Sequence, residues 1–182
     1  MRQPVTAEKL QAFMKALAVA TTVPTRVFLV GGATAVLFGW RTSTIDIDLK
    51  IIPESDEILR SLPALKEALQ VNVELASPDD FIPELPGWQE RSRFVQQIDK
   101  LTFYHYDFYA QALAKIERGH QTDLQDVGEL ISRGLVETKR LVELFSSIED
   151  QIYRYPSLDR KKFRQAVTCV VAETTSGLRK SD

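Results

Sequence analysis

The segment Ile45–Ile51 constrains the fold more than any other part of the chain, because apolar and charged residues alternate along it without interruption. A period of two is that of a β-strand, whose successive side chains point to opposite faces of a sheet. One face is therefore apolar, and the other carries Asp46, Asp48 and Lys50. Because Asp46 and Asp48 leave the same face of one strand, we expect their carboxylates to converge on a common site.

A second strand is predicted just before this segment. Val27–Val30 is a short run of β-branched, aromatic and aliphatic residues, which suits a buried strand. It ends at Gly31-Gly32, and residues 33–38 favour a short helix. Two glycines at such a turn let the backbone approach a ligand, and the free N–H groups of a helix start suit a phosphate. No Gly-Lys-Ser/Thr follows, so this is not a Walker A loop.

Asp46 and Asp48 require a counter-charge if they lie together on a sheet. Magnesium, which binds carboxylates together with substrate phosphates, is the cation that fits this oxygen-rich setting. Glu74 lies between Val73 and Leu75 on another alternating segment, and a third carboxylate suits a general base or a second metal ligand. Taken singly, each feature also fits the solvated face of a half-buried sheet.

The chain divides near Asp107 into an α/β part and a helical part. In the first part we expect a helix over residues 56–69, and Pro63 should force a break or restart in that helix. We expect an α+β fold, with a small mixed sheet and flanking helices over residues 1–106 and a helical lobe over 107–182 that packs on this core. The other elements expected in the first part are a helix over 6–19 and strands over 71–75, 94–98 and 101–106, the last two joined as a hairpin at Asp99-Lys100.

Bulk properties favour a cytoplasmic protein. The single cysteine, Cys169, excludes an internal disulfide and is typical of a reducing compartment. No apolar run approaches the roughly 20 residues that span a bilayer, so no membrane partner is expected. The net charge of −2 gives no global basic field, and an RNA partner would have to bind a local patch.

In order and spacing, the motifs resemble the signature of the DNA polymerase beta-type nucleotidyltransferase superfamily. Its pieces are Val30-Gly31-Gly32, then after thirteen residues Asp46-Ile47-Asp48-Leu49, and later Val73-Glu74-Leu75. Within the superfamily, two stretches look most like the AbiEii-type abortive-infection nucleotidyltransferases. One is Gly32-Ala33 together with residues 41–49, and the other is Ala114–Arg118 followed by Asp123-Leu124-Gln125-Asp126. Those families include toxin components of toxin–antitoxin pairs.

The resemblance implies a role for each matching residue in the sheet. Asp46 and Asp48 would be catalytic and would ligate magnesium, and Glu74 would be the third catalytic carboxylate. Gly31 and Gly32 would face the nucleoside triphosphate.

The resemblance also implies that Lys115 reaches the phosphates. On its predicted helix this lysine falls at the edge of the apolar face, from which its long side chain would extend into a cleft. Asp123 and Asp126 have a simpler interpretation, as negative charges in the first turn of the next helix, where they complement the helix dipole. His105 is isolated in the sequence and is assigned no role.

Together the motifs and the resemblance imply a magnesium-dependent, ATP-binding nucleotidyltransferase. It would move a nucleoside monophosphate from a nucleoside triphosphate to a hydroxyl of RNA or protein, and as a toxin it would have a cognate antitoxin protein as partner. Two alternatives stay open. One is a relative that no longer catalyses and binds a nucleotide or a partner protein; the other is an enzyme that modifies a small molecule.

Overall fold

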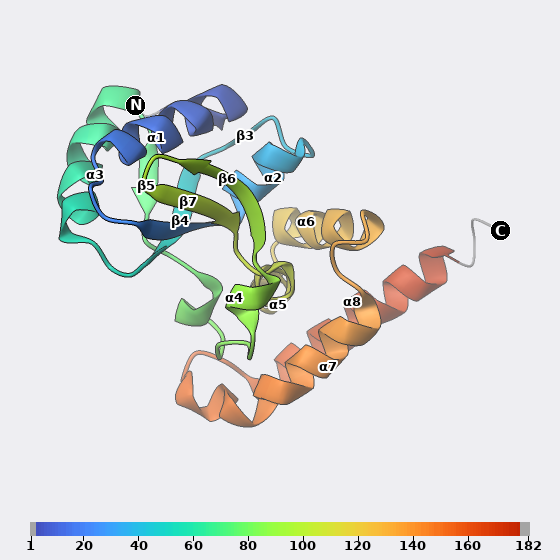
Figure 1. The fold of residues 1–182 in the computed structure, drawn as a ribbon. Helices are drawn as coiled ribbons and strands as arrows, with labels where there is room; N and C mark the ends of the chain where they lie inside the picture. Colours follow the sequence, from blue (N-terminus) through green and yellow to red (C-terminus); the bar gives the residue numbers. More distant parts are fainter. Residues whose placement is uncertain (1–2, 179–182) are drawn as a thin grey trace. The chain divides into compact units, whose positions relative to one another are not determined.

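The computed structural model describes residues 3–178 and shows the predicted α+β fold (Figure 1). Contacts within the chain divide it into two units. The first, called the α/β unit below, contains the residues up to Ser77 together with Ser92–Tyr106. The second, called the helical unit, contains Pro78–Arg91 together with the residues from Asp107 onward.

A five-stranded mixed sheet with the order β5-β4-β2-β7-β6 forms the centre of the α/β unit. β2 runs antiparallel to β4 and parallel to β7, β4 runs parallel to β5, and β6 and β7 form the predicted hairpin. The strands are β2 (Thr25–Val30), β4 (Asp46–Ile52), β5 (Asn72–Glu74), β6 (Arg93–Ile98) and β7 (Leu101–His105), and a separate pair joins β1 (Val5–Thr6) to β3 (Ser43–Thr44).

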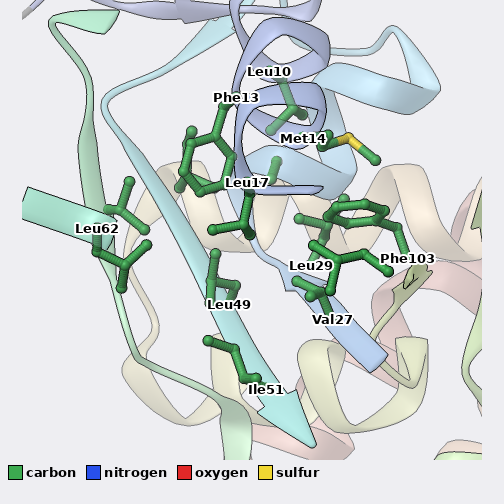
Figure 2. Close-up of a cluster of buried hydrophobic side chains, with 14 of the residues drawn as sticks. Leu10, Phe13, Met14, Leu17, Val27, Leu29, Leu49, Ile51, Leu62 and Phe103 are labelled. Atoms are coloured by element: carbon green, nitrogen blue, oxygen red, sulfur yellow. The ribbon is translucent and has the colours of Figure 1, made fainter. Parts of the chain in front are cut away.

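Helices α1 (Ala7–Val19) and α3 (Asp56–Leu69) bury one face of this sheet. Phe13, Met14 and Leu17 of α1 pack on side chains of β2, β4 and β7 (Figure 2). Burial of these apolar side chains, each worth about 1.5–3 kcal/mol, anchors the strands that carry the candidate site. The opposite face of β4 is therefore the one left for polar side chains.

Helix α3 does not break at Pro63, contrary to the sequence-based expectation. Proline removes one backbone N–H and so leaves the carbonyl one turn earlier without its helical partner. Pro63 is exposed, and Leu59, which carries that carbonyl, is 36% exposed, so water reaches this part of the helix. The apolar residues Ile58 and Leu62 remain in the core and hold the helix on the sheet.

An ion pair joins the end of the first chain segment of the helical unit to the start of the second. Arg91 contacts the buried carboxylate of Asp107 at 2.7 Å, and Asp107 also accepts a hydrogen bond from the N–H of Tyr109 as the N-cap of α5 (Phe108–Arg118).

The elements of this unit are η1 (Pro78–Asp80), α4 (Trp88–Arg91), α5, α6 (Gln121–Ser132), α7 (Thr138–Ile148), η2 (Glu149–Arg154) and α8 (Arg160–Leu178). None of the helices in the described residues is long and apolar enough to cross a membrane.

Candidate active site

The two aspartates of β4 share one face of the sheet, as the alternation predicts. Ile47 and Leu49 point into the core, whereas Asp46 and Asp48 are partly buried on the opposite face. In the register of the sheet, Asp48 lies opposite Val30, the last residue of β2. The pairing of β2 with β4 therefore carries Asp48 to the point where the glycine turn begins.

The neighbouring strand β5 adds two more polar side chains to this face. Asn72 lies opposite Asp46, and Glu74 lies opposite Asp48. The amide nitrogen Nδ2 of Asn72 donates to Oδ1 of Asp46 at 2.7 Å and to Oε1 of Glu74 at 3.0 Å. Three carboxylates and one amide are thus collected on two adjacent parallel strands. Asn72 was missed in the sequence, although it precedes Glu74 by two residues, just as Asp46 precedes Asp48.

Gly31 brings the backbone of the turn close to Asp48. Its φ of 58° and ψ of −120° place it in a region that residues with a side chain rarely adopt. A Cβ atom at this position would lie 3.4 Å from Oδ2 of Asp48. The absence of that atom lets the backbone of the turn lie against this carboxylate.

Gly32 is required for a different reason. It is the first residue of helix α2 (Gly32–Phe38), and a Cβ atom there would lie only 2.0 Å from the hydroxyl oxygen of Thr44. Contacts that short do not occur, so a side chain at Gly32 would displace β3. In this structure Gly32 therefore has no side chain because the side chain of Thr44 packs directly against its backbone. The expected role of Gly32 toward a triphosphate stays a prediction.

His105 supports the glycine turn from the core side and had no signal in the sequence. Its Nδ1 lies 3.1 Å from the hydroxyl of Thr34 in α2, and that hydroxyl donates to the carbonyl of Leu29 at 3.4 Å. The ring also packs on Phe38 with 4.8 Å between centroids. Burial, with a smaller contribution from the charge of Arg93, lowers the pKa of His105 to about 4. The imidazole is therefore neutral at physiological pH.

Lys115 lies in the helical unit and is buried, with 9% of its side chain exposed, rather than at the partly exposed edge predicted from the sequence. Its ammonium group contacts Asp126 at 2.7 Å and Asp123 at 3.2 Å. Arg118 also binds Asp123, through two hydrogen bonds of 2.6 and 2.7 Å. Burial raises the pKa of Asp123, but hydrogen bonds and charges from Arg118 and Lys115 outweigh it, so that the pKa is lowered. A role of Lys115 toward phosphates stays a prediction.

The donor set on the sheet suits magnesium only in company with a substrate. Among residues 3–178, no group of three or more His, Cys, Asp or Glu side chains is gathered closely enough to hold a metal ion alone. Asp46 and Asp48 supply two carboxylates on one face, and the turn at Gly31 lies against Asp48. Magnesium commonly uses one or two carboxylates and takes its other oxygens from water and substrate phosphates, which fits this arrangement.

A family model described as a nucleotidyltransferase of unknown function (DUF6036) matches residues 8–174, which is nearly the whole chain. No curated protein and no solved structure matches the chain significantly.

Proposed function

We propose a function that starts from family membership, because the chain belongs to this family of nucleotidyltransferases of unknown function. The chain transfers a nucleoside monophosphate from a nucleoside triphosphate to an acceptor hydroxyl, with magnesium as cofactor. The observation that carries the proposal is the pair Asp46 and Asp48 on one face of β4, with the glycine turn at Gly31 against Asp48. Two carboxylates beside an open backbone turn can hold a cation and the phosphates bound to it.

In the proposed reaction, the oxygen of the acceptor hydroxyl bonds to the α-phosphorus, and the bond from that phosphorus to the bridging oxygen breaks. Pyrophosphate leaves with the electron pair. The proton of the hydroxyl passes to a base, for which we assign the exposed carboxylate of Glu74, opposite Asp48 in the sheet. Asp46 and Asp48 would hold magnesium, which neutralises charge on the triphosphate. The protein contributes mainly position and electrostatic stabilisation, because its carboxylates are fixed on strands.

The acceptor and the biological role are further parts of the proposal. RNA or protein is the acceptor class implied by the resemblance to AbiEii-type enzymes, and an antitoxin is the partner implied by the same resemblance. The chain itself supports a macromolecular acceptor only in that Glu74 is exposed, so that a large molecule can reach it.

A second candidate function is nucleotide binding without transfer. It is favoured by the state of Glu74, which is exposed and hydrogen-bonded to Asn72. In that case Asp46 and Asp48 would bind a magnesium–triphosphate complex that the protein does not cleave.

The test is to incubate the protein with each nucleoside triphosphate, labelled at the α-phosphate, together with magnesium and either total RNA or a cell lysate. The proposal expects label to enter a macromolecule with the parent protein, and not with Asp46→Asn/Asp48→Asn or after chelation of magnesium. Digestion with ribonuclease or protease then identifies the acceptor. Magnesium-dependent binding without label transfer would instead support the second candidate, and neither binding nor transfer would contradict both.

A further inference from the structure

We infer that Asn72 is a positioning residue whose amide holds the carboxylates of Asp46 and Glu74 together while no cation is bound, and that it thereby makes magnesium binding depend on the triphosphate. The bridge itself is independent of the proposed function. The dependence on triphosphate rests on that function.

The side chains concerned form a square on one face of two strands. Asp46 and Asp48 are on β4, and Asn72 and Glu74 lie opposite them on β5. Directly opposed like charges in a sheet repel, so Asp48 and Glu74 disfavour each other. Nδ2 of Asn72 has two hydrogens, and it uses one for Oδ1 of Asp46 at 2.7 Å and one for Oε1 of Glu74 at 3.0 Å. The amide thus holds Glu74 within the square despite this repulsion.

An amide donor and a cation compete for the same carboxylate oxygens. Magnesium alone would have to displace Asn72 from Asp46, and it finds too few carboxylates gathered there to replace its water ligands. Magnesium carried by a triphosphate already has phosphate oxygens as ligands, so it needs fewer from the protein. We therefore expect the site to bind the magnesium–triphosphate complex but not the free magnesium ion.

Asn72 is the only asparagine in the sequence, which makes this bridge directly observable. Protein labelled with side-chain ¹⁵N-asparagine has one NH₂ pair in its ¹H–¹⁵N spectrum. Glu74→Ala should move one of the two proton resonances, and Asp46→Ala should move the other. Glu8→Ala, a loss of an exposed carboxylate from α1, is the matched control and should move neither. If neither Glu74→Ala nor Asp46→Ala moves the pair, the bridge is refuted.

The same signal tests the dependence on triphosphate. Magnesium alone at millimolar concentration should leave both resonances in place, whereas magnesium with an α,β-methylene triphosphate analogue should shift both. A full shift with magnesium alone would overturn the dependence. If the analogue does not bind the parent protein at all in calorimetry, the proposed function fails with the dependence, while the alanine variants still decide whether the bridge exists.

Asn72→Asp provides a second measurement that does not use the amide signal. The change keeps the shape of the side chain, removes both donors and adds a fourth carboxylate to the square. The variant should bind Mn²⁺ without any triphosphate at least about tenfold more tightly than the parent in calorimetry, which corresponds to about 1.4 kcal/mol. Equal affinities of the variant and the parent for Mn²⁺ would show that Asn72 does not restrain binding of the free ion.

Discussion

Gly31 and Asp48 are seventeen positions apart in the sequence, yet a Cβ atom on Gly31 would touch Oδ2 of Asp48 at 3.4 Å. The antiparallel pairing of β2 with β4 creates this contact, because it places Val30 opposite Asp48. The backbone of the turn therefore lies against the carboxylate of Asp48. The relationship therefore connects the glycine motif to the aspartate motif in one location.

Gly31→Ala should weaken magnesium–triphosphate binding as well as folding. Alanine at φ 58° and ψ −120° costs about 1–3 kcal/mol of backbone strain, and its methyl group would occupy the space beside Asp48. Gly39→Ala is the control, since Gly39 also has a positive φ of 82° but has nothing within 4 Å of a Cβ atom. Urea unfolding should show a loss for both variants, and calorimetry should show reduced triphosphate affinity for Gly31→Ala only. Equal affinities in the two variants would separate the turn from the site.

Asp46→Asn/Asp48→Asn should abolish magnesium-dependent triphosphate binding without unfolding the protein. The changes keep the shape of both side chains and remove two negative charges from one face of β4. Because like charges no longer repel, the free energy of unfolding without ligand should stay the same or rise by up to about 1 kcal/mol. Asp56→Asn, at an 84% exposed carboxylate of α3, controls for the loss of surface charge. Undiminished affinity in the double variant would remove the metal-site hypothesis.

Lys115→Ala should destabilise the protein strongly, whatever its effect on nucleotide binding. Removal of the ammonium group leaves the carboxylate of Asp126, 3% exposed, without this partner, and breaking a buried pair costs about 3–5 kcal/mol. Arg133→Ala breaks an exposed pair with Glu129 and should cost less than about 1 kcal/mol. Chemical denaturation of the two variants compares these losses directly. Similar small losses would mean that the buried pairs contribute little.

The sequence was sufficient for the parts of the fold that depend on local pattern. Alternation in Ile45–Ile51 predicts strand β4 and the common face of Asp46 and Asp48, and the structure has both. Apolar residues before Gly31-Gly32 predict β2 and the turn that follows it. These inferences succeed because a strand with one buried face must alternate with period two, whatever lies around it.

Other features depend on which elements become neighbours, and the local pattern does not contain that information. Asn72 acquires its partner Asp46 only through the register of β4 with β5. Lys115 looked like a residue at the edge of a helix, and Asp123 and Asp126 looked like ordinary charges of a first turn. Their mutual burial follows from the packing of α5 on α6, which decides that three charges share one location.

The neutral state of His105 predicts how stability depends on pH. The pKa of this imidazole is about 4 in the folded protein and about 6.5 in the unfolded chain, so the unfolded chain binds more protons between these values. Its contribution to stability is therefore complete above pH 6.5 and is lost as the pH falls toward 4, by about 3 kcal/mol in all.

In His105→Gln this part of the pH dependence should disappear, so the unfolding free energies of parent and variant should converge as the pH falls from 6.5 to 4. His120→Gln, at an exposed histidine, should keep the dependence of the parent. Denaturant unfolding at several pH values measures the three curves, and parallel curves for the parent and His105→Gln would show that His105 is not held neutral by the fold.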